Sequence, residues 1–320
     1  MTDGAADGVG DRSGDPAVRR RSGLIAGFGA YLLWGAMPVY FLAMRAGAVE
    51  IVGARILSSL IFCGLLVLLL RRGSALRRVL RDRRTVLTLG LAGVLIYVNW
   101  QVYVAATTSD HVTDAALGYF INPIVTVLLG VIVLRERLRP GQWAAVGISL
   151  LAVVVLTAEA RAVPWISLVL AASFALYGLV KNRVGSTVDP LSGLVFETAW
   201  LAPVAVVQLV IVGVGGGLTW GTSGLLPTLL LTTAGIGTAI PLLLFAASTN
   251  RLPLTVVGFL QYLTPILQLG LGVLVLQEPM PPARLIGFSI VWLALIVLVV
   301  ESLVAGGRIR RSARPPVTDG

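Results

Sequence analysis

The chain has 320 residues, of which 57% are hydrophobic and only 12% are charged, and its mean hydropathy is +0.91. Soluble domains carry about 25% charged residues, so this composition excludes an ordinary soluble protein and indicates one that crosses a membrane several times. The net charge of +10 also suits a nucleic-acid-binding protein. However, the arginines lie in short tracts between apolar runs, where they act as topology signals, and we expect no nucleic-acid partner.

Residues 1–21 form a polar arm that is rich in Gly, Asp, Ala and Arg and lacks the apolar core of a signal peptide. We predict a disordered cytoplasmic arm there, a first five-helix repeat over residues 22–158, a second over residues 162–304, and a cytoplasmic tail over residues 305–320.

The predicted fold class is an all-α integral membrane protein with ten transmembrane helices, since a spanning helix needs roughly 20 mostly apolar residues. The fifth and sixth candidates are short. In chain order the ten spans run approximately over residues 24–44, 51–70, 86–106, 112–134, 142–157, 164–180, 191–212, 226–248, 254–276 and 285–304.

The basic residues predict how these spans are oriented. Twenty-one of the 25 Lys and Arg residues fall on one side of the membrane and three on the other. This count assigns Lys181 and Arg183 to the loop between the sixth and seventh spans. Because positively charged loops stay in the cytoplasm, we expect both termini to be cytoplasmic and the protein to lie in the cell (inner or plasma) membrane.

Residues 117–140 recur at residues 259–282, with a constant offset of 142 and nine identities in 24 positions. Glu136, for example, matches Glu278. The period covers five predicted spans, an odd number, so the two copies enter the membrane from opposite sides. The sequence therefore predicts two inverted repeats, an architecture typical of secondary transporters whose substrate site lies near the membrane midplane.

Two ionisable residues fall within the spans. Each costs roughly 2.5–3.5 kcal/mol to insert, so such residues face protein or water and are candidates for function. Arg55, in the second span, and Glu197, in the seventh, are mates at the 142-residue offset. We expect both to flank a central cavity, with Arg55 binding an anionic group of the substrate and Glu197 a cation or a coupling proton. The alternatives are a structural ion pair, or an Arg55 side chain that extends toward the membrane surface.

His111 and Asp114 open the fourth span, and His111 is the only histidine. Both are candidates for proton coupling, because histidine titrates near neutral pH. The alternatives are that His111 is a solvated loop residue and that Asp114 caps the helix, where a carboxylate is favoured.

Pro123 and Pro265 occupy matching positions in the repeated helix. Proline removes a backbone donor and kinks a helix, and in a transporter such a kink can open a polar pocket. We predict that both prolines are hinges. The alternative is that they are simply tolerated, as proline often is in membrane helices.

Polar and aromatic residues accompany these prolines. Asn99, Asn122 and Gln261 are amides within spans, which cost free energy unless they are hydrogen-bonded. Trp34 and Tyr177 lie near mid-span, at matching positions of the weaker echo between YLLWG and FALYG. We expect these five residues to line the cavity.

The sequence contains no H-E-x-x-H motif, no pair of cysteines and no phosphate-binding G-x-x-x-x-G-K-[ST] loop. Cys63 is the sole cysteine and is expected to be a small packing residue. We therefore expect no metal, no cofactor, no catalytic residues and no enzymatic activity.

Segments spread over most of the chain resemble one known family; they include AYLLWGAMPVYF (Ala30–Phe41), NWQVYVAA (Asn99–Ala106), HVTDAALGYFINP (His111–Pro123) and GLVFETAWLAP (Gly193–Pro203). The chain resembles the RarD branch of the EamA family in the drug/metabolite transporter superfamily. The resemblance implies ten helices in two inverted halves and export of amino acids, metabolites or drugs. It also implies a carboxylate near the start of the fourth span, where this chain has Asp114 and such proteins commonly have Glu.

Together these patterns predict a secondary active transporter that moves a small metabolite or drug-like molecule by alternating access, coupled to protons or another ion. The expected partners are the substrate, the lipid bilayer and the coupling ion, with a homodimer as a further option. The alternatives are a passive channel or facilitator with the same fold, and an intramembrane enzyme, which the lack of a nucleophile–base pair or metal set disfavours.

Overall fold

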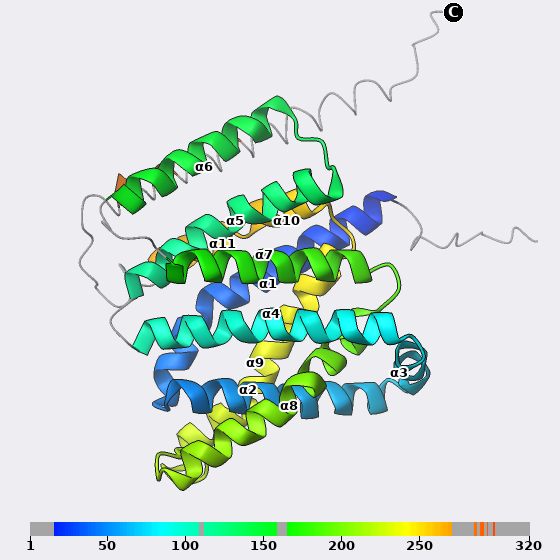
Figure 1. The fold of residues 1–320 in the computed structure, drawn as a ribbon, viewed down its shortest axis with the longest axis vertical. Coiled ribbons are helices and arrows are strands. Elements are labelled where there is room, and N and C mark those ends of the chain that lie inside the picture. The colour runs from blue at the N-terminus through cyan, green and yellow to red at the C-terminus, as the bar shows by residue number, and fades with distance from the viewer. Residues whose placement is uncertain are drawn as a thin grey trace, which may run out of the picture.

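The computed structural model describes residues 16–108, 112–158 and 165–270, together with six single positions between residues 285 and 297. Within these residues the chain forms eleven α-helices and no strand (Figure 1). In chain order they are α1 (Pro16–Met44), α2 (Ala48–Leu69), α3 (Gly73–Leu80), α4 (Arg83–Thr108), α5 (Val112–Leu134), α6 (Pro140–Ala158), α7 (Trp165–Val184), α8 (Pro190–Val214), α9 (Leu225–Thr249), α10 (Leu254–Leu260) and α11 (Leu263–Gly270).

Five stretches are long and apolar enough, by length and composition, to cross a membrane: Ala48–Leu69, Arg83–Ala106, Trp165–Val184, Pro190–Val214 and Leu225–Thr249. Gly118–Leu134 and Leu254–Leu267 are shorter apolar helical stretches. The predicted all-α membrane fold is confirmed, and the predicted fourth span coincides with α5. The predicted tenth span falls mainly outside the described residues, so the ten-helix inverted repeat stays a prediction.

The short helix α3 was not predicted, because it lies in the basic segment between the second and third predicted spans. Asp82, just before α4, shows how the next helix begins: its carboxylate accepts hydrogen bonds from the Arg84 backbone N–H at 3.0 Å and from the Thr85 hydroxyl. This N-cap interaction, above all the hydrogen bond from Thr85, lowers the pKa of the Asp82 side chain.

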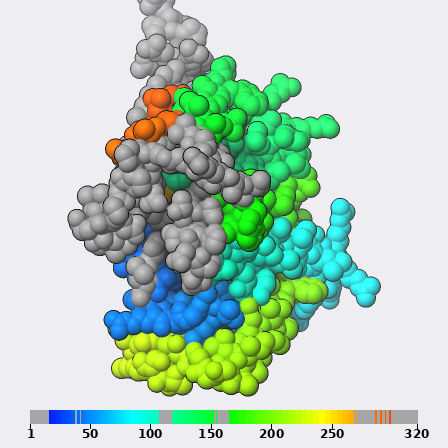
Figure 2. Space-filling model, turned by 60° about the vertical axis from the view of Figure 1, so that its left-hand side comes forward, coloured from blue at the N-terminus to red at the C-terminus, as the bar shows by residue number. Residues whose placement is uncertain are grey.

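The helix ends alternate between the two ends of the bundle. The start of α1, the helix α3, the α7–α8 turn and the α9–α10 junction gather at one end, on the right in Figure 1. Figure 2 shows the region of α3, in cyan, projecting from the body of the molecule. These are the connections whose basic residues predict a cytoplasmic location, so the fold is consistent with the alternation that the charge pattern requires.

Helices from the two halves of the sequence pack against each other. Helix α2 contacts α8 and α9, α1 contacts α9, and α5 contacts α10. At the α2–α9 crossing, a Cβ atom added to Gly235 would lie 2.1 Å from the Ser58 carbonyl carbon. Only glycine therefore permits this backbone-to-backbone approach, a device typical of membrane helix packing.

Two carboxylates of the first half bind backbone amides of the second half. Glu136, which follows α5, accepts hydrogen bonds from the N–H groups of Leu254 at 2.7 Å and Thr255 at 2.9 Å, at the start of α10. Glu50, wholly buried near the start of α2, accepts from the N–H groups of Thr219 at 2.9 Å and Trp220 at 2.6 Å. These contacts join the two halves at opposite ends of the bundle.

The predicted ninth span is broken into two helices. Helix α10 ends at Leu260 and α11 begins at Leu263, with Gln261 and Tyr262 in the turn between them. Pro265 lies in the first turn of α11 and has no N–H to donate toward the Gln261 carbonyl. In the first half, Pro123 lies inside the continuous helix α5. The two matching prolines therefore sit in different local structures.

Lys181 corrects one assignment made from the sequence. It is a helical residue in the last turn of α7 and is 5% exposed, whereas the charge count places it in a loop. The apolar run ends at Val180, but the helix continues to Val184. Arg183 is also a residue of α7, though an exposed one, and removing both residues from the loop count leaves the charge asymmetry in place.

Candidate functional site

A cavity of about 80 Å³ lies among α1, α2, α4, α5, α7 and the α10–α11 turn. Its wall combines aromatic rings, amides and one cationic side chain. The lining residues are Tyr31, Trp34, Met37, Phe41, Arg55, Asn99, Trp100, Tyr103, Gly118, Tyr119, Asn122, Leu170, Phe174, Gln261 and Thr264. A largely apolar cavity with a few convergent polar groups is the usual form of a small-molecule site.

Arg55 supplies the charge on this wall. Its guanidinium lies 4.5 Å from the ring centroid of Trp100 and 5.0 Å from that of Phe41, and its Nε donates to the Thr238 hydroxyl at 2.9 Å. Cation–π contacts with desolvated rings contribute on the order of 2 kcal/mol each. Among the described residues, no carboxylate pairs with Arg55. Within the described part of the chain, two rings and a hydroxyl hold the side chain in place, and no counter-charge does.

Helix α5 and the segment from the α10–α11 turn into α11 contribute matching positions to the wall. Tyr119 and Gln261 are separated by 142 residues, as are Asn122 and Thr264, and all four line the cavity. Asn122 and Thr264 directly precede the two prolines. The cavity therefore lies where the repeated elements meet, as the predicted pseudo-symmetry requires of a central site.

Hydrogen bonds fix the amides of the wall. Asn99 donates to the Leu170 carbonyl at 2.9 Å and to the Ser173 hydroxyl at 3.1 Å, which joins α4 to α7. The Thr126 hydroxyl lies 3.2 Å from the Gln261 side-chain oxygen. These contacts satisfy some of the donors and acceptors of Asn99 and Gln261 and fix the orientation of the two side-chain amides.

Two buried donors on the wall lie close to each other without forming a hydrogen bond of normal geometry. The Tyr31 hydroxyl and the Gln261 side-chain nitrogen meet no hydrogen-bond partner of normal geometry within the described part of the chain. Their residues are 2% and 4% exposed. Since a buried polar group without a partner costs about 1–3 kcal/mol, the wall suits a molecule that presents acceptor atoms to these groups.

Aromatic rings form another part of the wall. The Trp34 ring lies 5.5 Å from the rings of both Tyr31 and Phe174, and 5.6 Å from that of Phe245. Such tilted and edge-to-face contacts add about 0.5–1.5 kcal/mol per pair beyond the area that they bury. The rings therefore present a stiff apolar surface beside the polar groups.

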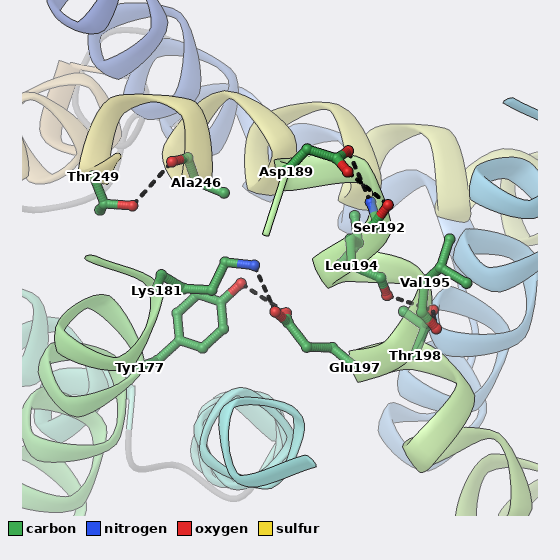
Figure 3. Close-up of polar contacts among 10 residues, drawn as sticks. All are labelled: Tyr177, Lys181, Asp189, Ser192, Leu194, Val195, Glu197, Thr198, Ala246 and Thr249. Carbon is green, nitrogen blue, oxygen red and sulfur yellow. Dashed lines mark hydrogen bonds and ion pairs between the residues drawn. The ribbon is translucent and has the colours of Figure 1, made fainter. Parts of the chain in front are cut away.

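Glu197 and Tyr177 lie outside the lining of this cavity, although both were expected there. The Glu197 carboxylate binds Lys181 Nζ at 2.5 Å and the Tyr177 hydroxyl at 3.0 Å, so that α7 and α8 are joined (Figure 3). Glu197 is 1% exposed and Tyr177 is completely buried. An ion pair between Arg55 and Glu197, one of the alternatives, is thus replaced by a pair between Lys181 and Glu197.

Five of the other predicted site residues line the cavity. Trp34, Arg55, Asn99, Asn122 and Gln261 are all brought together around the cavity.

Asp114 lies near the start of α5, and its side chain falls outside the described residues, as does the whole of His111. Pro123 and Pro265 are buried and adjoin the cavity through their preceding residues. No group of three or more His, Cys, Asp or Glu side chains is placed to hold a metal within the segments that the structure describes.

The sequence did not single out Lys181, although its spacing held a signal. Tyr177 and Lys181 are four residues apart on α7, and Gly193 and Glu197 are four residues apart on α8, so each pair shares a helix face. Lys181 lies one turn after the mid-span Tyr177 on the same helix face, and this spacing makes it a candidate ion-pair partner for Glu197 in the next span.

Comparison with known proteins identifies a family of transporters that the chain matches. Residues 21–158 match the model of the EamA-like transporter family. The chain is 45% identical to Protein RarD of Streptomyces exfoliatus, over 91% of this chain and 92% of that protein. It is 38% identical to an uncharacterized transporter of Pseudomonas aeruginosa, over 92% of this chain and 98% of the relative.

One solved crystal structure shares the fold, with a TM-score of 0.64 and 21% identity over 87% of this chain and 97% of the other. At that identity the likeness concerns the fold alone. The two sequence relatives, in contrast, match this chain over nearly its whole length. The chain belongs to the EamA-like transporter family, as a RarD-type membrane protein.

Proposed function

We propose that this protein is a secondary active transporter that moves a small molecule with an anionic group and an apolar part. The observation that carries this proposal is the guanidinium of Arg55, which lines the cavity without a carboxylate partner among the described residues. A buried cation of this kind is unfavourable alone and favours an anionic ligand. The aromatic wall around Trp34 would hold the apolar part.

The matching prolines support alternating access. Gly258 of α10 packs against α5 so closely that an added Cβ would lie 3.1 Å from the Pro123 carbonyl oxygen. The break before Pro265 leaves α10 and α11 joined by one turn. Rocking of the two halves would therefore move Asn122 and Gln261 relative to each other, which would change the shape of the cavity.

Coupling to protons or another ion is part of the proposal. Glu197, Asp114 and His111 are the candidates from the sequence, and Glu197 lies in a buried charged group next to the aromatic wall. The predicted orientation, with both termini in the cytoplasm, and a location in the cell membrane complete this account of the protein.

Reconstituted vesicles test the proposal. Purified protein is inserted into liposomes, and uptake is measured for a panel of radiolabelled amino acids and small aromatic carboxylates, with and without a pH gradient. We expect saturable uptake of at least one compound that depends on the gradient and is lost in Arg55→Gln. Non-saturable flux would instead indicate the passive channel, and chemical conversion of a compound would indicate an enzyme.

The matched control is Arg137→Gln, which removes an exposed arginine outside the cavity. It should leave uptake unchanged. If both variants lose uptake equally, the loss reflects net charge or folding and contradicts a specific role for Arg55.

A further inference from the structure

The second half of the chain contains a buried charged group formed by Lys181, Glu197 and Tyr177, separate from the cavity lining. We propose that this group is a proton-binding site, in which Glu197 takes up the proton and Lys181 is the cation that the proton displaces. The inference rests on the proposed transport function and identifies the site that couples transport to protons.

The geometry leaves the carboxylate with one donor on each oxygen. Lys181 Nζ lies 2.5 Å from Oε1, and the Tyr177 hydroxyl donates to Oε2 at 3.0 Å (Figure 3). Gly193, one turn before Glu197 on α8, makes room for the ammonium group, since an added Cβ would lie 3.0 Å from Nζ. The absence of a side chain at Gly193 thus leaves the space that the Lys181 ammonium group occupies.

The surroundings of Glu197 contain few other titratable groups. Besides Lys181 and Tyr177 on α7, the Cys63 thiol of α2 lies within electrostatic range. Helix α4 presents the uncharged residue Gly93 to the Glu197 backbone, and α9 carries no charged residue between Leu225 and Thr249. Among the described residues, Lys181 is therefore the cation in direct contact with Glu197.

A purely structural role explains this ion pair poorly. Desolvating two charges generally costs as much as their attraction returns, and replacing a buried pair by apolar residues is often neutral or stabilising. Within a membrane, intramembrane ionisable residues are candidates for function for the same reason. Lys181 and Glu197 are 5% and 1% exposed, so both are largely desolvated.

The proton step is balanced without any further reactant. Hydronium gives a proton to the Glu197 carboxylate, which forms an O–H bond and leaves water, while Lys181 stays an ammonium, so the pair changes from neutral to singly positive. Release of that proton to water restores the starting state. A buried unpaired ammonium is unfavourable, and Lys181 lies in the last turn of α7, from where it can extend toward water at the end of the helix.

An aromatic path leads from the pair to the cavity. The Tyr177 ring stacks on Phe245, with centroids 5.7 Å apart and planes at 14°. Phe245 in turn contacts Trp34 at 5.6 Å and Tyr31 at 6.3 Å, and both of these residues line the cavity. A change in the Tyr177 hydrogen bond would therefore be transmitted to the cavity wall through packed rings.

Infrared difference spectroscopy on the purified full-length protein in lipid nanodiscs tests the site without a known substrate. Acidification from neutral pH should produce a protonated-carboxyl band that is lost in Glu197→Gln and kept in Glu136→Gln. In Tyr177→Phe the band should shift in frequency, because one hydrogen bond to the carboxyl is removed. A band that is unchanged in Glu197→Gln and in Tyr177→Phe overturns the proposal.

Lys181 gives a second, independent readout. Lys181→Gln removes the cation beside the carboxylate, so the pH dependence of the band should change in this variant. The exposed neighbour Arg183→Gln should leave the midpoint unchanged. An unchanged midpoint in Lys181→Gln would contradict control of Glu197 by Lys181. This variant also carries the test if Glu197→Gln does not fold.

Transmission to the cavity is measured by tryptophan fluorescence. The pH-dependent component that Trp34→Phe removes should also be absent in Glu197→Gln, and its persistence there would disprove coupling. Because none of these measurements uses a substrate, the outcomes are distinguishable. If the Glu197 band is observed but no ligand binds the Arg55 cavity, the proton site stands and the transport proposal is rejected. If a ligand binds the cavity but no Glu197 band is observed, the transport proposal stands and the proton site is rejected.

Discussion

The Nε atom of Arg55 donates to the Thr238 hydroxyl at 2.9 Å, which joins α2 of the first half to α9 of the second. The hydroxyl is the one protein hydrogen-bond acceptor recorded for this guanidinium within the described residues, and the two aromatic rings supply its remaining contacts. Thr238 therefore sets the direction in which Arg55 presents its charge to the cavity.

Thr238→Val should weaken anion binding without preventing folding. The variant keeps the side-chain shape and removes a hydrogen bond to a charged group, which contributes about 1.5–3 kcal/mol, so the dissociation constant should rise by roughly ten- to a hundredfold. Calorimetric titration with a compound that binds the wild type measures this change. The control is Thr198→Val, since the buried Thr198 hydroxyl donates only within α8, to the Leu194 and Val195 carbonyls. Equal loss in both variants would contradict a specific role for Thr238.

Gly193→Ala should destabilise the protein or expel the Lys181 ammonium, because the added methyl would lie 3.0 Å from Nζ. Overpacking of this kind costs roughly 1–3 kcal/mol. Gly213→Ala on the same helix meets no atom within 4 Å and should be neutral or slightly stabilising. Thermal unfolding of both variants, followed by size-exclusion chromatography, compares them directly. A Gly193→Ala variant as stable as Gly213→Ala would show that the Lys181 pocket is not tightly packed.

Gly235→Ala should prevent the α2–α9 crossing from forming. The new Cβ would lie 2.1 Å from the Ser58 carbonyl carbon and 2.3 Å from the Ser59 nitrogen, and neither backbone atom can move aside as a side chain does. We expect a loss of about 3 kcal/mol or more in stability and a strong fall in the yield of monodisperse protein. Gly237→Ala would meet the flexible end of Met37 at 3.3 Å and the Tyr40 ring at an ordinary contact distance of 3.6 Å, and should be tolerated. Comparable yields of the two variants would argue against this packing.

Glu136→Ala should loosen the junction between α5 and α10. It removes two charge-assisted hydrogen bonds, to the Leu254 and Thr255 amides, each of which contributes about 1.5–3 kcal/mol before solvent compensates for part of the loss. The melting temperature should fall measurably, while Arg137→Ala, at the exposed neighbouring position, should change it little. If the two variants have the same melting temperature, the Glu136 contact does not stabilise the fold.

Apolar runs and basic loops made most of the membrane architecture predictable. The predicted fourth span matches Val112–Leu134 because its apolar run is bounded by polar residues on both sides. The helix α3 was not predicted because it is short and lies in an arginine-rich connection, although Leu76 and Val79 give it an apolar side that packs against the body. The break at Gln261 was not predicted either, because an apolar run does not show where a helix is interrupted.

Site residues could be predicted where a polar residue is unusual within an apolar span. The interaction partner of such a residue was harder to predict. Arg55, Asn122 and Gln261 stand out as polar residues within apolar spans, and the structure brings them to one cavity. The partner of Glu197 depends on how α7 and α8 are rotated against each other, which a single sequence does not encode locally. For the same reason Lys181, at the end of an apolar run, was assigned to solvent.

A ligand-stabilisation screen tests the central claim most directly. Purified wild-type protein and Arg55→Gln are heated with a library of small organic anions, cations and neutral compounds, and the change in melting temperature is recorded for each. We expect stabilising compounds to be mainly anions with an apolar part, and their effect to disappear in Arg55→Gln but not in Arg137→Gln. Stabilisation by cations or neutral compounds alone, or by anions equally in Arg55→Gln, would contradict a cavity built around the Arg55 charge.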